Sequence, residues 1–173
     1  MEVKFRDLRA DEIDVRVNSI NEKGCTLLLY KDARVDMDIL DETVGCMNWM
    51  RVHSRENANC TVYIWDNDKK EWVSKEDTGT ESFTEREKGL ASDSFKRACF
   101  NWGIGRELYT APDIWITAAN VKIVEKNGKF STYDKFAVSK ILILNKKIIG
   151  LAIRNVTQGK RVFVLLPEGD KNE

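Results

Sequence analysis

Residues 86–109 read REKGLASDSFKRACFNWGIGRELY and carry the clearest structural signal in the chain. At 3.6 residues per turn, a helix built from these residues gathers small and apolar side chains on one face. These are Ala91, Phe95, Ala98, Cys99 and Trp102. Gly103 and Gly105 are the expected stop, and the capping-box spacing of Thr84 and Glu87 is the expected start. The sequence therefore predicts one amphipathic helix at the centre of the fold.

The opposite face of this helix is charged and holds one aromatic ring. Its members are Arg86, Asp93, Lys96, Arg97 and Phe100. Single-stranded nucleic acid can use such a face, because cations hold phosphates and a ring stacks on a base. The alternative is a solvated face, in which Asp93 and Arg97 form an ordinary i,i+4 pair worth about 0.2–0.5 kcal/mol and the phenylalanine packs on a neighbour. Considered alone, the helix favours the alternative, because most charged helix faces are simply solvated.

The composition is that of one globular domain over residues 1–173, with 42% hydrophobic and 32% charged residues. There is no long apolar run and no cationic leader before an apolar segment, so neither a membrane span nor a secretory signal is expected. The cysteines lack paired spacing, which favours buried thiols in the reducing cytoplasm over disulfides or a metal site. They are Cys25, Cys46, Cys60 and Cys99.

Charge is unevenly distributed along the chain, although its net value is zero. Residues 1–85 carry 12 Lys and Arg against 19 Asp and Glu, whereas residues 107–173 carry 11 against 7. Within this second part, residues 120–165 carry 10 against 2. Such a chain can present a positive surface although its net charge is zero. The acidic half of one subunit can also attract the basic half of another.

Turn signals and alternating apolar residues divide the rest of the chain into short elements. Before the central helix, the pattern predicts a strand at 25–30, a helix from the Asp32 cap to Val44, and an antiparallel meander over 48–77. After it, strands are expected at 115–124, 136–144, 148–153 and 161–165, with Asn127-Gly128 as a hairpin turn. The predicted fold class is α+β: an antiparallel meander packed on a long helix, followed by a C-terminal basic β-hairpin extension.

No catalytic set is recognisable in the sequence. A phosphate-binding Gly-x-x-x-x-Gly-Lys-Ser/Thr loop does not occur, and His53, the single histidine, has no acidic or thiol partner near it in sequence. Glu76 and Asp77 could hold a metal for a nuclease, but adjacent residues of a strand point to opposite faces. The prediction is a protein that is not an enzyme and needs no cofactor or metal.

Several motifs occur together around the central helix. They are EKGLASDSFKRA at 87–98, WGIGRELY at 102–109, the Leu40–Gly45 helix end with Asn48-Trp49, and Glu76-Asp77-Thr78-Gly79 closing the meander. In this order they resemble the Sak-type phage single-strand annealing proteins, the phage branch of the Rad-fifty-two recombination-mediator family. The likeness covers roughly residues 8–110.

The resemblance implies a β-β-β-α core that assembles into rings or helical filaments. Single-stranded DNA is held in a groove outside the assembly and paired with its complement without ATP, in phage or prophage recombination and repair. A cationic groove that holds the backbone and exposes the bases needs no covalent chemistry. The expected partners are single-stranded DNA, further copies of the chain and a host single-strand-binding protein. The basic extension over 112–166 lies outside the likeness.

The candidate DNA-binding residues are Lys96, Arg97, Arg16, Lys70, Phe100 and Arg86. The resemblance implies DNA contacts by Lys96 and Arg97 on the central helix, by Arg16 before the first strand and by Lys70 in the meander turn. Phe100 stands where eukaryotic members have an arginine, and it can stack on a base or pack against a neighbour. Arg16 can instead pair with a nearby aspartate, and Lys70 can be a solvated turn residue.

Two other functions stay open from the sequence. One is a module that coats single-stranded DNA without pairing it, which an annealing assay would distinguish. The other is a metal-dependent nuclease that uses Glu76 or Asp77, which product formation with magnesium or manganese would reveal.

Overall fold

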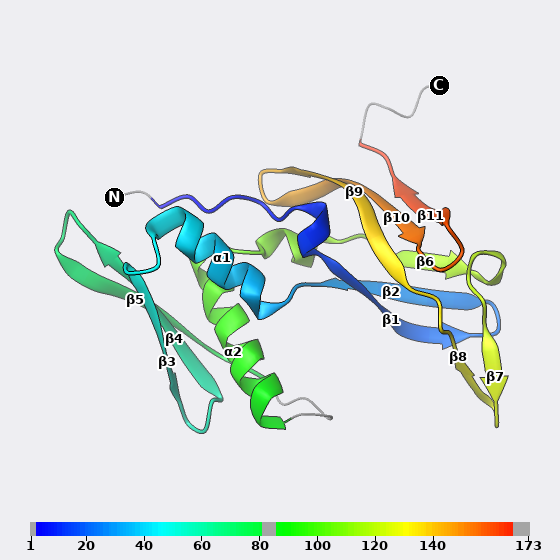
Figure 1. The fold of residues 1–173 in the computed structure, drawn as a ribbon, viewed down its shortest axis with the longest axis horizontal. Helices are drawn as coiled ribbons and strands as arrows, with labels where there is room; N and C mark the ends of the chain where they lie inside the picture. Colours follow the sequence, from blue (N-terminus) through cyan, green and yellow to red (C-terminus); the bar gives the residue numbers. More distant parts are fainter. Residues whose placement is uncertain (1–2, 81–85, 168–173) are drawn as a thin grey trace. The chain divides into compact units, whose positions relative to one another are not determined.

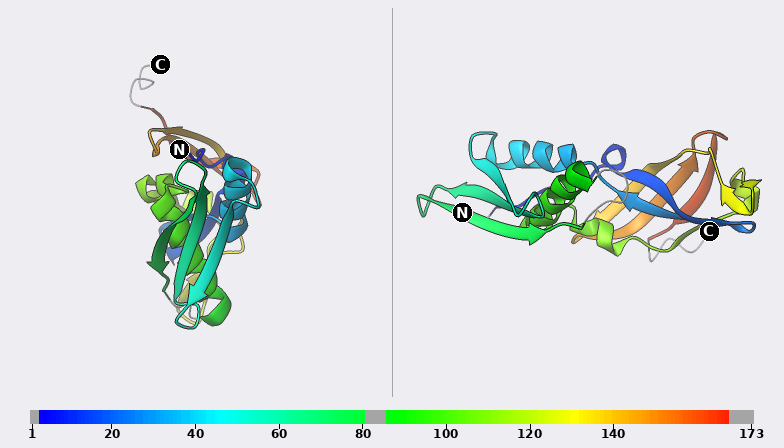
Figure 2. Two further views of the ribbon diagram at one scale, coloured as in Figure 1. Left: turned by 90° about the vertical axis from the view of Figure 1, so that its left-hand side faces the viewer. Right: turned by 90° about the horizontal axis from the view of Figure 1, so that it is seen from below.

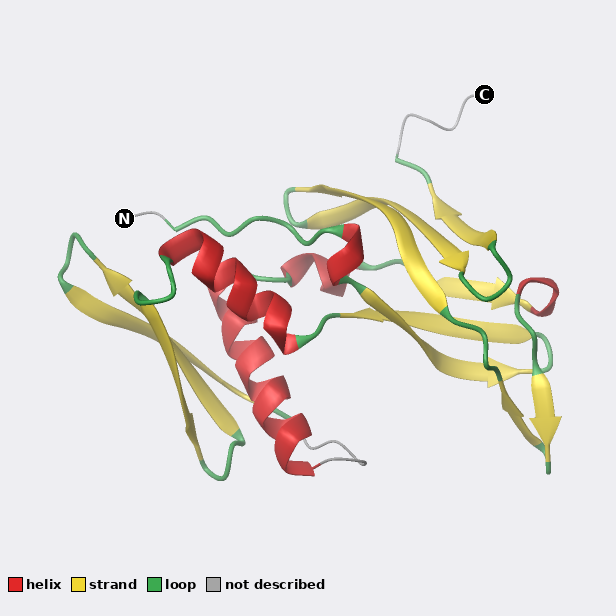
Figure 3. Ribbon diagram, viewed as in Figure 1, coloured by secondary structure: helices red, strands yellow, loops and turns green. Residues whose placement is uncertain are grey.

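The computed structural model describes residues 3–80 and 86–167, with side chains from Gly89 onward in the second range. The fold is mixed α+β, built mainly of antiparallel strands with two α-helices among the described residues, so the predicted class is confirmed at this level (Figure 3). Neither helix of the described part is both long and apolar enough to cross a membrane. Contacts divide the chain into two compact units. Unit 1 comprises Met1–Asp7 and Asp32–Arg106, and unit 2 comprises Leu8–Lys31 and Glu107–Glu173.

The antiparallel meander of unit 1 is confirmed. Its strands β3 (Trp49–Ser54), β4 (Asn59–Asp66) and β5 (Glu71–Thr78) pair in that order and lie side by side in the left view of Figure 2. Alternate side chains of β4 point to one face, where Cys60, Val62 and Ile64 are buried. This face of the meander forms one side of the hydrophobic core of unit 1.

Helix α1 (Ala33–Val44) begins where its cap predicts. The Asp32 carboxylate accepts a hydrogen bond of 2.8 Å from the Arg34 amide, which satisfies one of the unpaired donors of the first turn. Ile39 and Leu40 of this helix are fully buried, as expected from their spacing. The cap and the apolar stripe together account for this helix.

Helix α2 (Arg86–Trp102) is the predicted central helix, and it stops at Gly103. Gly103 has φ +102°, a conformation that L side chains rarely adopt. Its amide donates to the Phe100 carbonyl at 3.0 Å, and the Ile104 amide donates to the Cys99 carbonyl at 3.1 Å. This pair of bonds is the Schellman arrangement, which satisfies the last carbonyls of a helix.

The inner face of α2 packs on β4 and β5 (Figure 1). Phe95, Ala98 and Cys99 are fully buried, as predicted. Trp102 is half buried, and its indole N–H donates to the Val62 carbonyl at 3.1 Å. The expected capping box at the start of the helix lies outside the described residues and side chains.

Gly79 lets the end of the meander approach α2 closely. A Cβ at this position would lie 2.6 Å from the amide nitrogen of Ser94. The Gly79 amide donates to the Ala58 carbonyl at 2.8 Å, and the next amide, of Thr80, donates to the Asp93 carboxylate at 2.8 Å. A glycine is therefore needed where the predicted meander closes on the helix.

Unit 2 is built on a six-stranded antiparallel sheet in the order β11-β10-β9-β1-β2-β6. Its strands are β1 (Asp14–Asn21), β2 (Gly24–Tyr30), β6 (Ile114–Thr117), β9 (Phe136–Leu144), β10 (Lys147–Asn155) and β11 (Lys160–Leu165). The edge strands β6 and β11 contact each other, so the sheet curls around one core (Figure 1). Buried side chains of this core include Leu27, Leu29, Ile116, Val138 and Ile153.

The division into units differs from the expected boundary near residue 110. Residues 8–31 were expected with the central helix, but they belong to the same unit as the C-terminal strands. In that unit Asp14 of β1 pairs with Ala137 of β9. Pairing between segments so distant in sequence leaves no local signal, because alternation reports a buried face and not a partner strand.

One predicted strand is wrong. Residues 115–124 do not form a single strand, since β6 ends at Thr117 and a 3₁₀ turn covers Ala118–Asn120. The next strand, β7 (Val124–Lys126), pairs with β8 (Lys129–Ser131) in a separate hairpin whose turn is the predicted Asn127-Gly128.

Hydrogen bonds to the Asp134 carboxylate explain why the chain does not continue as one strand from β6 through residue 124. The carboxylate accepts hydrogen bonds of 2.8 Å from the Lys122 amide and 2.7 Å from the Asn155 side chain, and a further one from Gln158. Burial alone would raise the pKa of Asp134, but these hydrogen bonds outweigh burial and lower it. The carboxylate thus holds the chain where a continuous strand would otherwise run.

Three of the four cysteines are buried, but Cys46 is exposed, so the expectation of four buried thiols is wrong for Cys46. It lies just after α1, before β3 begins. Burial raises the pKa of the Cys25 and Cys60 thiols to about 11.

Candidate nucleic-acid interface

The face of α2 opposite its buried side chains carries Lys96, Arg97 and Phe100. At 100° per residue these three side chains lie within one turn on the same side of the helix. Each is half buried. Asp93, one turn earlier, accepts hydrogen bonds from the amide and the hydroxyl of Thr80, which hold its carboxylate toward the end of the meander. Two cations therefore flank one ring on this face.

Arg97 is oriented by the end of β5. Its Nε lies 3.6 Å from Asp77 Oδ1 and has no hydrogen-bond partner among the described residues. The same carboxylate accepts hydrogen bonds from the Asn101 side chain at 3.2 Å and from the Thr78 amide at 2.7 Å. The Arg97 side chain is still 42% exposed, so it is held in position and remains accessible to an anion.

Lys96 lies near the start of α1. The Arg34 side chain donates to Asp32 at 2.9 Å and holds the pKa of this carboxyl below its usual value, and the charge of Lys96 adds a smaller contribution. Among the described residues, Lys96 itself is in no ion pair. Of the two helix cations, Lys96 is the one less engaged by the protein.

Two further cations cover the C-terminal end of α2. The Lys75 ammonium donates to the Asn101 carbonyl at 2.9 Å and lies 4.8 Å from the ring centroid of Trp102. The Arg106 guanidinium donates to the Phe100 and Asn101 carbonyls, at 2.9 Å each, and lies 5.5 Å from the Phe100 ring. Cations here satisfy the last carbonyls and oppose the negative end of the helix dipole. Phe100 thus packs against a cation of its own unit.

We refer to Lys75, Lys96, Arg97, Phe100 and Arg106 as the α2 cluster. It joins charges from β5, from α2 and from the segment after the helix around the last turns of α2. Guanidinium and ammonium groups bind phosphates, and an aromatic ring can stack on a base, so the cluster has the chemistry of a nucleic-acid surface.

A third cation–ring pair lies on β3. The Arg51 guanidinium is 4.5 Å from the ring centroid of Phe95, and Trp49 stacks on the same ring at 6.1 Å. Burial, with a contribution from the charge of Arg51, lowers the pKa of His53, and the Ser94 hydroxyl lies 3.4 Å from its Nδ1. These contacts make His53 a packing residue between β3 and α2.

Lys70 and Arg86 do not join the α2 cluster. Lys70 has φ +54° in the turn between β4 and β5, roughly 16 Å of extended chain from Lys75. Arg86 is the first residue of α2, roughly 16 Å of helix from Arg97. The Arg86 side chain lies outside the described part of the structure.

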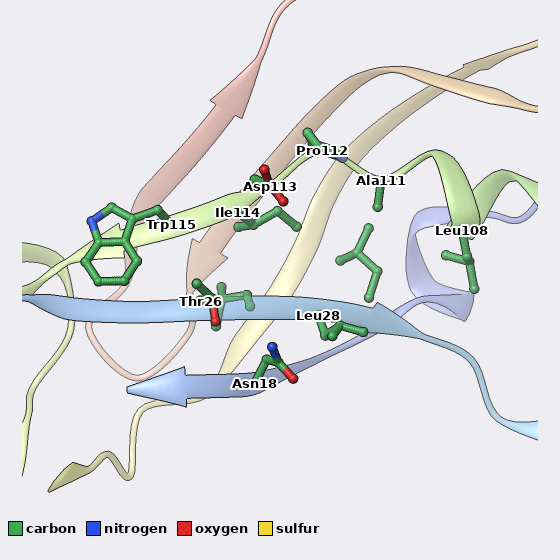
Figure 4. A pocket seen from close by; sticks show the side chains of 11 residues that line it. Asn18, Thr26, Leu28, Leu108, Ala111, Pro112, Asp113, Ile114 and Trp115 are labelled. Carbon is green, nitrogen blue, oxygen red and sulfur yellow. The ribbon is translucent and has the colours of Figure 1, made fainter. Parts of the chain in front are cut away.

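Arg16 belongs to unit 2. Its guanidinium lies 5.5 Å from the ring centroid of Tyr30, and the strand register puts it opposite Leu28. Leu28 lines a groove of about 540 Å³ together with Thr26 and Trp115, which Figure 4 shows. Arg16 is thus part of a surface of unit 2, while Lys96, Arg97 and Phe100 are brought together in unit 1.

Glu76 and Asp77 point to opposite faces of β5, as predicted. Glu76 accepts hydrogen bonds from the Thr61 and Asn59 side chains, at 2.7 and 2.8 Å, and these bonds lower its pKa. Asp77 faces α2 and binds Asn101. Within the described ranges, no group of three or more His, Cys, Asp and Glu side chains is arranged to hold a metal ion.

Sequence reasoning missed Arg51, Lys75 and Arg106. An arginine just after a helix-stopping glycine pair is a signal for a cation on the last carbonyls, and Arg106 fits that pattern. Arg51 and Lys75 carry no such signal. The register places both opposite Val62 on the buried face of the meander, which only the folded sheet reveals.

No protein-family model, curated protein or solved structure matches the chain. The sequence motifs and the geometry of the α2 cluster are therefore the basis for assigning a function.

Proposed function

We propose that the chain binds single-stranded DNA through the α2 cluster and pairs complementary strands without ATP. The observation that carries the proposal is the gathering of four cations, Lys75, Lys96, Arg97 and Arg106, at the last turns of α2, where Arg106 lies 5.5 Å from the Phe100 ring and Lys75 lies 4.8 Å from the Trp102 ring. Lys75 and Arg106 are held against the helix end by hydrogen bonds of 2.9 Å, so little side-chain freedom is lost when a phosphate binds them. Lys96 and Arg97 extend the positive charge along the same helix.

The resemblance to Sak-type annealing proteins supports this choice of ligand. In the proposal, the meander and α2 are the β-β-β-α core of that family. Residues 112–166, expected as a C-terminal hairpin extension outside the likeness, instead supply four of the six strands of the unit 2 sheet. Arg16, Lys70 and Arg86 are further candidate contacts along the DNA path. The site of action is the cytoplasm, in phage or prophage recombination and repair, with a host single-strand-binding protein as a further partner.

Assembly of several copies is part of the proposal. Unit 1 carries 13 Lys and Arg against 17 Asp and Glu, and unit 2 carries 15 against 11. Opposite net charges let unit 1 of one copy attract unit 2 of another, in a ring or a helical filament. A continuous DNA path along such an assembly would join the α2 clusters of successive copies.

A two-strand annealing assay tests the function. Complementary oligonucleotides carrying a donor and an acceptor dye are mixed with and without the protein, in the absence of ATP. The proposal requires pairing faster than in the protein-free mixture. A protein that binds either strand but leaves the pairing rate unchanged would be a coating module, and product fragments in the presence of magnesium would indicate a nuclease.

A further inference from the structure

The outer face of β9, β10 and β11 in unit 2 carries a row of cations with no assigned role. Its exposed members are Lys140 of β9, Lys147 and Arg154 of β10, and Arg161 of β11. We refer to these four residues as the sheet strip. The chain has no Asp or Glu between Asp134 and Glu168, so the three strands contribute no negative charge to it.

The strand register places these side chains on one face. Ile153 and Asn155 are buried on the core side, so Arg154 between them points outward. Lys140 pairs with Ala152, and Arg154 pairs with Arg161 directly across the β10–β11 ladder. Side chains opposite one another on neighbouring strands are on the same face of a sheet.

The pair Arg154–Arg161 is electrostatically unfavourable by itself. Like charges directly opposite on adjacent strands destabilise a sheet unless an anion lies between them. Among the described residues, neither guanidinium takes part in an ion pair or a hydrogen bond, and the same is true of the Lys140 and Lys147 ammonium groups. In contrast, the neighbouring Lys160 donates to the Ala119 carbonyl at 2.8 Å.

The residues between the cations are small or apolar. Ala137 and Ala152 lie beside Arg154 and Lys140, and Leu142 folds over Gly150, whose Cβ position would be 3.1 Å from Leu142 Cδ1. A backbone of phosphates and sugars can therefore approach the strip closely. The register puts one carboxylate at its border, Asp14 of β1, opposite Ala137.

We infer that the sheet strip is a second nucleic-acid site, which binds the phosphate backbone of a single strand. Planar guanidinium groups bind phosphate oxygens in pairs, and adjacent strands set Arg154 and Arg161 about 5 Å apart, close enough for one phosphate to contact both. From Lys147 to Arg154 the strip spans about 23 Å of β10, enough for several nucleotides. The choice of nucleic acid as the polyanion rests on the proposed function.

The test compares three variants with the native protein for binding to a fluorescent thymidine oligonucleotide at several salt concentrations. The strip variant carries Lys140→Ala, Arg154→Ala and Arg161→Ala. The matched control carries Lys23→Ala, Lys126→Ala and Lys129→Ala, which remove three cations at the turns of other hairpins in unit 2. The third protein is Lys96→Ala, which affects the α2 cluster alone.

If the strip binds three phosphates, the strip variant loses about two units of the slope of log affinity against log salt, and about tenfold or more in affinity at 0.1 M salt. The control should match the native protein. Equal binding by the strip variant and the control would overturn the inference. If only Lys96→Ala loses binding, the proposed function is supported and the second site is rejected. A strip variant that retains its affinity but no longer self-associates in light scattering would show that the strip contacts another copy, which also overturns the inference.

Discussion

Arg97 has two roles, because it pairs with Asp77 at the end of β5 and presents positive charge on α2. Its partner Asp77 receives hydrogen bonds from Asn101 and Thr78 that do not need the arginine. The ion pair is partly exposed, so it contributes only about 0–1 kcal/mol to stability. Asp77 therefore neutralises part of the charge that Arg97 offers to a ligand and adds little to the stability of the fold.

The substitution Asp77→Asn should separate these roles. Removing the carboxylate charge leaves the Asn101 contact possible and raises the net charge beside Arg97. We expect oligonucleotide binding to strengthen by roughly two- to tenfold at low salt, with a loss of no more than about 1 kcal/mol in unfolding free energy. Fluorescence anisotropy and urea unfolding measure the two quantities. Weaker binding by a folded variant would mean that the ion pair itself forms the site.

The thiols give a second prediction at the scale of single residues. Thiolate is the reactive form, and burial raises the pKa of Cys25 and Cys60 to about 11, so little thiolate is present at pH 8. Cys46 is exposed. We expect one thiol to be alkylated rapidly at pH 8 and the other three only after unfolding, as counted by mass spectrometry. The rates at Cys25 and Cys60 should rise with pH up to about 11, and rapid labelling of two or more sites at pH 8 would contradict the burial.

The end of the meander packs so closely on α2 that only glycine fits at position 79. A Cβ at Gly79 would overlap the backbone of Ser94, whereas a Cβ at Gly103 would meet nothing within 4 Å and would only strain the helix stop. Gly79→Ala should therefore cost about 1–3 kcal/mol and Gly103→Ala about 1 kcal/mol. Urea unfolding of both variants measures the difference. A smaller effect at Gly79 than at Gly103 would contradict the close packing of the meander on α2.

Most elements could be predicted from the sequence because their signals are local. The Asp32 cap, the glycine stop after Trp102 and the alternation in β3 to β5 are read from neighbouring residues. The prediction of one strand over 115–124 was wrong because the Asp134 carboxylate, twelve residues beyond Lys122, accepts a hydrogen bond from the Lys122 amide. A neighbour so far along the chain leaves no local signal. Likewise, Lys75 reaches α2 only through strand pairing, so the composition of the α2 cluster could be predicted only in part.

At the scale of the whole molecule, charge separation follows the two compact units. Unit 1 has four more acidic than basic residues, and unit 2 has four more basic than acidic ones. The α2 cluster is thus a positive site on a unit that is negative overall. A localised site of this kind should bind DNA with a steep dependence on salt, since its long-range attraction is weak and the phosphate contacts dominate.

Binding of single-stranded DNA by the α2 cluster is tested by the affinity of Lys96→Ala/Arg97→Ala for a fluorescent oligonucleotide at 0.1 M salt. A control, Arg55→Ala/Lys69→Ala, removes two exposed cations from the turns of the same meander. Circular dichroism and light scattering check that fold and assembly are unchanged, and Lys96→Ala alone avoids any loss of the Asp77 contact. We predict about a tenfold or greater loss of affinity for the double variant and little change for the control. Native affinity in a folded double variant would mean that the α2 cluster does not bind DNA.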